Sequence, residues 1–180
     1  MNQPNAPLTP DGIRQVPSDK ALLDALFVEL SREVPASLHD DLDEFVSAIQ
    51  DLPAGLRAMA ATYQLDVSMT LDDLGWHFAN WHHRGYGAET SWALRELEAT
   101  ELSELFDRAF SIVGHQWEAV SECLAEGFDT FVEWYSTSEL EATLMPLNRR
   151  WWELCNSEND GLFRYWVTYA RKYPERVVPT

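Results

Sequence analysis

The chain has 180 residues, of which 46% are hydrophobic, so it can bury a sizeable core and fold as a globular domain. It carries 30 acidic and 13 basic side chains, a formal net charge of −17. This excess repels phosphates, which excludes direct binding to a nucleic-acid backbone and favours attraction to basic partners. No apolar run approaches the roughly 18 residues that mark a transmembrane helix, so we expect no membrane contact.

The N-terminal segment predicts a cytoplasmic protein. Residues 1–17 contain four prolines and lack the basic and apolar regions of a secretory signal peptide. We expect a flexible tail over residues 1–17 and a single all-helical domain over residues 18–180. The two cysteines, Cys123 and Cys155, are too few for a disulfide framework and are expected to be reduced thiols.

Amphipathic helices are predicted from the start of this domain. Apolar side chains recur at three- and four-residue intervals from Leu22 onward. Ser18 is suited to cap the first helix, and Pro35 ends it. A second helix is expected to begin near Asp41, because a carboxylate there complements the helix dipole. Pro53 suits the first position of a third helix.

Residues 70–99 are the densest aromatic segment and predict a helix, a turn and a second helix. Thr70 and Asp73 have the spacing of a capping box, with Asp in place of the usual Glu. Residues 80–87 are rich in turn-forming types, and their two glycines can supply positive φ angles. We therefore expect a polar turn across this range.

The remaining chain also predicts helices. One helix is expected to end at Gly114 and the next at Gly127. Ser138 and Glu141 form a second capping box, and Pro146 either breaks that helix or begins another. No segment shows the period-two alternation of a strand. The predicted fold is all-α, an irregular single-domain bundle of about nine or ten short helices.

Two segments, residues 75–110 and 147–177, resemble the bacterial DNA-mimic-protein-like family of all-helical domains. The first contains a Gly-x-x-x-x-Asn turn before an amphipathic helix, and the second is a Tyr-rich closing helix that ends in Tyr-Pro-Glu. The family is named for a member described as imitating DNA and engaging a DNA-binding protein. The matching positions are Gly75, Phe78, Asn80, Leu94, Leu97, Ala99, Tyr169, Pro174 and Glu175.

The resemblance covers about residues 40–176 and has two departures. Glu98 stands where the family usually has Gly, and Tyr173 stands where it often has His. The resemblance implies an all-helical scaffold. It also implies, for function, a DNA mimic that occupies the basic nucleic-acid site of a DNA-binding protein.

Acidic residues are concentrated in one part of the chain. Residues 96–141 hold 12 acidic side chains and one basic side chain, Arg108, a net charge of −11. Like charges four residues apart destabilise a helix by a few tenths of a kcal/mol. The lack of interleaved Lys therefore favours a functional surface, and a solvated face that maintains solubility is the alternative. The predicted partner-binding residues are Glu101, Glu104, Asp107, Glu118, Glu122, Glu126, Asp129 and Glu133.

The spacing of these acids sets a requirement for DNA mimicry. One carboxylate per four helical residues gives a charge about every 6 Å. A DNA strand carries one phosphate about every 3.4 Å. A single helix is therefore too dilute, and two acidic helices side by side, or a homodimer that brings them together, would be needed. Mimicry therefore requires the helices bearing Glu101–Asp107 and Glu118–Asp129 to present their acids on one continuous surface.

Two other functions stay open at this stage. Small size, acidity and helical structure are also typical of immunity-type proteins, which neutralise a cognate toxin. His77, His82 and His83 are metal-ligand types and allow a metal-dependent hydrolase. However, there is no His-Glu-x-x-His motif, and adjacent histidines on a helix point about 100° apart. We therefore expect no catalytic residue, no metal and no cofactor.

Overall fold

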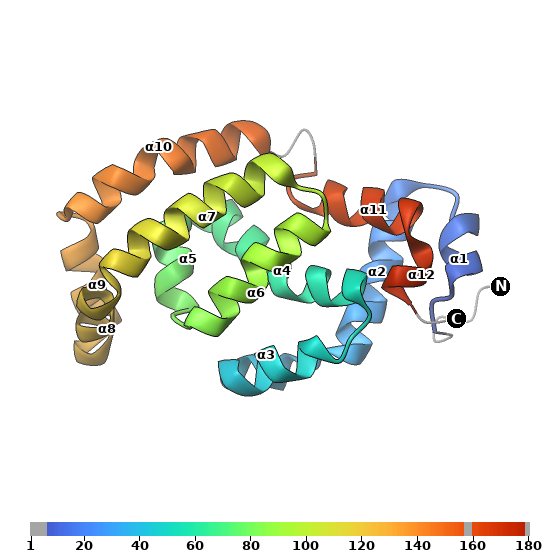
Figure 1. Cartoon of the computed structure of the whole chain (residues 1–180), viewed down its shortest axis with the longest axis horizontal. Helices are drawn as coiled ribbons and strands as arrows, with labels where there is room; N and C mark the ends of the chain where they lie inside the picture. The colour runs from blue at the N-terminus through green and yellow to red at the C-terminus, as the bar shows by residue number, and fades with distance from the viewer. Residues whose placement is uncertain (1–6, 157–159, 179–180) are drawn as a thin grey trace.

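The computed structural model describes residues 7–156 and 160–178, and in these it contains helices and no strand (Figure 1). The helices are α1 (Pro10–Gln15), α2 (Asp19–Glu33), the 3-10 helix η1 (Ala36–Asp40), α3 (Leu42–Gln50), α4 (Ala54–Leu71), α5 (Leu74–Asn80), α6 (Arg84–Glu96), α7 (Thr100–His115), α8 (Trp117–Glu126), α9 (Phe128–Tyr135), α10 (Glu139–Leu154), α11 (Phe163–Lys172) and α12 (Pro174–Val177). Ten of the α-helices have seven residues or more, so the all-α prediction is confirmed. Among the described residues, none of the helices combines the length and apolar character needed to cross a lipid bilayer.

Two apolar clusters share the long central helices. The first lies towards the chain termini and surrounds Trp166, and the second lies around Phe106 and Trp151. Helix α4 contributes Met59 to the first cluster and Leu65 to the second. Helices α4 and α6 pack along each other between the two clusters. This shared pair joins the clusters into one domain.

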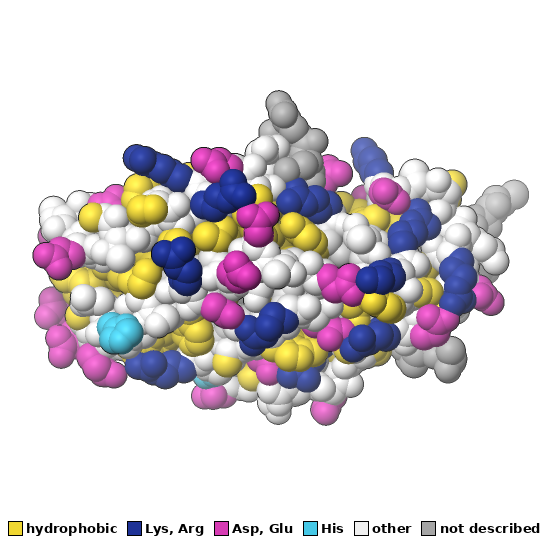
Figure 2. All heavy atoms as spheres, turned by 45° about the horizontal axis from the view of Figure 1, so that its top comes forward, with side chains coloured by type: hydrophobic (Ala, Val, Ile, Leu, Met, Phe, Trp, Pro, Cys, Tyr) yellow, Lys and Arg dark blue, Asp and Glu magenta, His cyan; other side chains and the backbone are white. Residues whose placement is uncertain are grey.

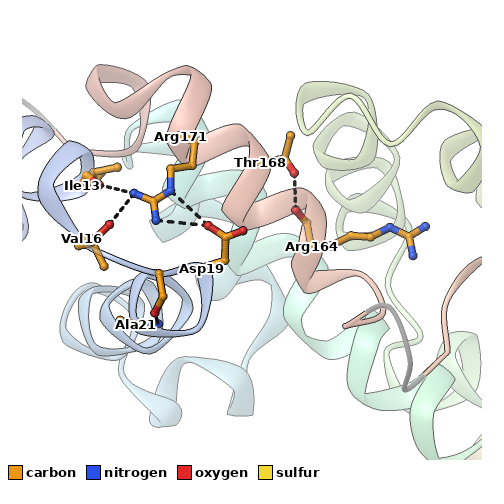
Figure 3. A network of polar contacts seen from close by, with 8 residues as sticks. Ile13, Val16, Asp19, Ala21, Arg164, Thr168 and Arg171 are labelled. Atoms are coloured by element: carbon orange, nitrogen blue, oxygen red, sulfur yellow. Dashed lines mark hydrogen bonds and ion pairs between the residues drawn. The ribbon is translucent and has the colours of Figure 1, made fainter.

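The predicted flexible tail over residues 1–17 is wrong for the part that forms α1. Ile13 of α1 is fully buried. Arg171 of α11 donates hydrogen bonds to the carbonyl oxygens of Ile13 and Val16, each at 3.0 Å, and forms an ion pair with Asp19 at 3.3 Å (Figure 3). The guanidinium thus provides hydrogen-bond donors for carbonyl groups at the end of α1. A helix of six residues would have little stability on its own. Residues 1–6 lie outside the described part of the chain.

The predicted turn over residues 80–87 is shorter than expected. Helix α6 already begins at Arg84, so Gly85 and Gly87 are helical and neither has a positive φ. Gly87 instead makes room for a ring, because a Cβ there would lie 2.7 Å from Phe110 Cε2. The predicted capping box is also wrong, since α4 continues through Thr70. Asp73 alone caps α5, accepting a hydrogen bond from the Trp76 backbone N–H at 3.0 Å.

The later boundaries follow the sequence more closely. Ser138 caps α10 and accepts from the Glu141 backbone N–H, which is one half of the predicted capping box. The Ser138 backbone N–H donates to the Tyr135 carbonyl oxygen at 3.1 Å instead of to Glu141. Gly127 ends α8 with φ +136°. Gly114, by contrast, lies within α7, which continues to His115. Pro146 lies inside α10, and neither ends it nor begins a new helix.

The two departures from the resembled family contact each other. Glu98 has φ +59°, in the left-handed region where glycine is favoured because it has no Cβ. Its carboxylate accepts a hydrogen bond from the Tyr173 hydroxyl at 2.8 Å and pairs with Lys172 Nζ at 2.7 Å. These two partners lower the pKa of Glu98. Tyr173 therefore supports the side chain that stands in place of a glycine.

We expect Glu98→Gly to be more stable than Glu98→Ala. Both substitutions remove the contacts with Lys172 and Tyr173, but only glycine also relieves the left-handed backbone. The cost of that region is about 1 kcal/mol for a residue with a Cβ, which corresponds to a melting temperature about 2–4 °C higher for the glycine variant. Thermal unfolding followed by circular dichroism measures the difference. Equal melting temperatures would show that the backbone at this position is unstrained.

Candidate partner-binding surface

Helices α8 and α9 form a helical hairpin, here called the acidic hairpin (residues 117–135). Helix α7 leads into α8 through Gln116, and Gly127 reverses the chain into α9. The two helices pack against each other. They lie at the end of the molecule opposite the two chain termini (Figure 1).

Aromatic contacts attach the acidic hairpin to the domain. The indole of Trp117 stacks on the ring of His82 with centroids 3.9 Å apart, and the Arg84 guanidinium lies 4.5 Å from its centroid. On α9, buried Phe131 contacts the ring of Trp76 at 6.1 Å. His82 Nε2 also lies 2.7 Å from Ser121 Oγ on α8. Most of the apolar surface of both helices is therefore covered, and their charged sides face solvent.

Five of the predicted acidic residues lie on this hairpin. They are Glu118, Glu122, Glu126, Asp129 and Glu133, and all five are exposed. Within the described residues, no ion pair involves any of them. Figure 2 shows acidic side chains gathered at this end, whereas acidic and basic side chains alternate over the rest of the same face. Burial and the nearby carboxylates of Glu126 and Glu122 raise the pKa of the Cys123 thiol.

The three acids of α7 have different surroundings. Glu101 pairs with Arg150 of α10 at 2.6 Å. Asp107 pairs with Arg95 of α6 at 2.8 Å and accepts a hydrogen bond from the Ser91 hydroxyl. Glu104 is exposed and has no ion pair within the described residues. The structure therefore separates the eight residues into an acidic hairpin and an α7 group in which two carboxylates are already paired.

One apolar residue at the hairpin surface was not singled out by its sequence. Phe128 begins α9 directly after Gly127, between Glu126 and Asp129. Its side chain is 40% exposed, although one edge contacts Trp76 with ring centroids 5.4 Å apart. The sequence did not indicate this exposure, because periodicity alone cannot tell a hairpin corner from a buried position.

The three histidines of the aromatic segment point to different neighbours. His77 is buried and lies 3.1 Å from Ser68 Oγ. His82 contacts α8, as described above, and its pKa is lowered chiefly by burial. His83 caps α6 by accepting from the Tyr86 backbone N–H and also lies 3.0 Å from Asp43. In the described part of the chain, no three His, Cys, Asp or Glu side chains are grouped to hold a metal ion.

These features define an all-α protein that presents an acidic helical hairpin at one end. Residues 50–173 match the family model for DMP19-like protein, and the chain belongs to this family. The match includes the whole acidic hairpin and confirms the predicted relationship to DNA-mimic-like proteins. Comparisons with curated proteins and with solved structures gave no match.

Proposed function

We propose that this protein uses the acidic hairpin to occupy the basic nucleic-acid site of a DNA-binding protein. The observation that carries the proposal is the set of five exposed carboxylates on two adjacent helices, with no ion pair to any described basic side chain. Such a surface attracts Lys- and Arg-rich sites through long-range electrostatics. Membership of the DMP19-like protein family supports the same proposal independently of the surface charge.

The charge density of the hairpin fits this role. Helix α8 has 10 residues and is therefore about 15 Å long. Five carboxylates over that length give about one charge per 3 Å, against one phosphate per about 3.4 Å along a DNA strand. The packing of α8 against α9 brings two acidic helices together, which supports mimicry by the hairpin, whereas Glu101 and Asp107 of α7 are paired with arginines.

Two contributions to affinity follow from this surface. The carboxylates contribute an electrostatic part that weakens as salt screens the charges. The exposed ring of Phe128 at the hairpin corner adds an apolar part that salt does not screen. We therefore propose that the partner site is basic at its rim and offers an apolar contact to the ring.

Neutralising the acidic hairpin is expected to weaken partner binding at least tenfold at about 50 mM salt. The test variant replaces Glu with Gln and Asp with Asn at Glu118, Glu122, Glu126, Asp129 and Glu133. The control variant makes the same changes at five exposed acids elsewhere, Asp24, Glu33, Asp40, Glu44 and Asp51. Partners are captured at low salt, identified by mass spectrometry as salt rises, and then titrated in purified form with both variants.

Competition with duplex DNA makes the experiment specific for mimicry. The captured protein should bind DNA, and DNA should displace it from this protein. A salt-independent affinity, or equal losses in both variants, would contradict the proposed surface. A partner that DNA does not displace would instead favour the immunity-type alternative.

A further inference from the structure

A cavity of about 690 Å³ lies between α4, α10 and the start of α11, away from the acidic hairpin. A second hollow of about 310 Å³ adjoins it towards α2. The two share Asp66, Thr70 and Leu71 of α4, together with Phe163 of α11. A volume of this size accommodates a small organic molecule.

Aromatic side chains form much of the cavity wall. Trp152 is 38% exposed, and its indole N–H donates to the Met69 carbonyl oxygen at 3.1 Å, which fixes the ring against α4. Phe163 lines both hollows. Leu71, at the edge, is 74% exposed, the largest value among the exposed large apolar side chains. The cavity therefore offers aromatic and apolar surface that is partly open to solvent.

The charged residues that line the cavity within the described part of the chain are all acidic. Asp66, Asp72 and Asp160 line it, and among the described lining residues there is no Lys or Arg. Arg164 lies near Cys155 in the wall, but its guanidinium donates to the Leu154 carbonyl oxygen at 2.8 Å and stacks on Tyr165. The described lining is therefore electronegative, and the guanidinium of Arg164 is already held by other groups.

Asp66 is the carboxylate best placed to meet a ligand. It faces both hollows, and burial raises its pKa. It accepts a hydrogen bond from the Leu162 backbone N–H at 3.0 Å. Within the described residues it forms no ion pair. A half-buried carboxylate without a cation is costly, and a positively charged ligand would offset that cost.

We propose that this cavity binds a small organic cation, an ammonium group carried on an apolar or aromatic frame. The ammonium lies against Asp66, with Asp72 and Asp160 adding to the attraction. The frame packs against Trp152 and Phe163, whose π faces favour a cation and its attached carbon atoms. A neutral ligand of the same shape would gain the packing and lose the ionic contact.

The first test compares two probes of nearly equal shape, 4-phenylbutylammonium and 4-phenylbutan-1-ol, by isothermal titration calorimetry with the full chain. We expect one ammonium ion to bind per chain, at least tenfold more tightly than the alcohol. Heteronuclear NMR should show a shift of the Trp152 indole N–H signal, assigned through Trp152→Phe. Equal affinities, or no binding of the ammonium at millimolar concentration, would overturn the proposal.

The second test separates a built site from general attraction to an acidic protein. Asp66→Asn should reduce ammonium affinity at least tenfold, because the amide cannot neutralise the ligand. Asp51→Asn removes the same charge at an exposed position outside the cavity and should leave the affinity unchanged. An equal loss in both variants would contradict the site. If Asp66→Asn does not fold, Asp72→Asn is used in its place. We expect Asp72→Asn to reduce ammonium affinity about threefold. An unchanged affinity in that variant would also contradict the proposed site.

Discussion

Replacing Gly75 with alanine is expected to destabilise the protein by about 3 kcal/mol, because the new methyl group overlaps a buried tyrosine. A Cβ at Gly75 would lie 2.1 Å from Tyr135 Oη and 2.2 Å from its Cζ. Real Cβ atoms do not approach other heavy atoms so closely. Either the tyrosine must move, or α5 must separate from α9.

Tyr135 has little freedom to move away. Its hydroxyl donates to the carboxylate of Asp73 at 3.1 Å, and its ring stacks on Phe131 with centroids 5.4 Å apart. The same carboxylate caps α5 by accepting from the Trp76 backbone N–H. Displacing the tyrosine therefore also disturbs a helix cap and the attachment of the acidic hairpin.

Gly114→Ala provides the matched control for this prediction. Gly114 lies within α7, and an added Cβ would meet nothing within 4 Å. Alanine there should not destabilise the protein, since the added methyl group meets no neighbour and alanine forms helix more readily than glycine. Urea unfolding followed by circular dichroism gives both values. The double variant Gly75→Ala, Tyr135→Ala should lose less unfolding free energy than the sum of the losses in the two single variants. Additive losses would exclude the proposed overlap between the new methyl group and the tyrosine.

Sequence periodicity predicted the helices that bury an apolar stripe. Leu22, Leu26 and Leu30 follow the helical spacing, and all three are buried in α2. Helix α1 shows the limit of that reasoning. It is too short to signal itself by periodicity, and it depends on Arg171, a residue more than 150 positions away. Contacts of that kind are set by the tertiary fold, which local spacing does not encode.

The candidate surface, like the helices, was predictable where it depends on local spacing and not where it depends on tertiary contacts. Four-residue spacing placed Glu118, Glu122 and Glu126 on one exposed side of α8, where the structure has them. Spacing could not show that Glu101 and Asp107 meet arginines from α10 and α6. The partner-binding role of all eight residues stays a prediction.

Acidification is expected to destabilise the protein through His77. This side chain is fully buried, and that burial lowers its pKa from 6.5 to about 3. The unfolded chain binds a proton near pH 6.5, whereas the folded chain does not until the pH is close to 3. Stability therefore falls as pH decreases between these values. From pH 6.5 to 4.5 the contribution of His77 is at most about 2.7 kcal/mol, at about 1.36 kcal/mol per pH unit.

His77→Gln isolates this contribution, because glutamine does not titrate and its amide can still bond to Ser68. The free energy of unfolding of both proteins, measured with urea at intervals between pH 7 and 4.5, should fall less steeply in the variant. His115→Gln is the control, since it makes the same substitution at an exposed histidine. The other acid-sensitive groups, including His82 and the carboxylates, are common to all three proteins and cancel in the comparison. A slope in His77→Gln equal to that of the unsubstituted chain would mean that the folded protein protonates His77 near its ordinary pKa, which complete burial among apolar rings opposes.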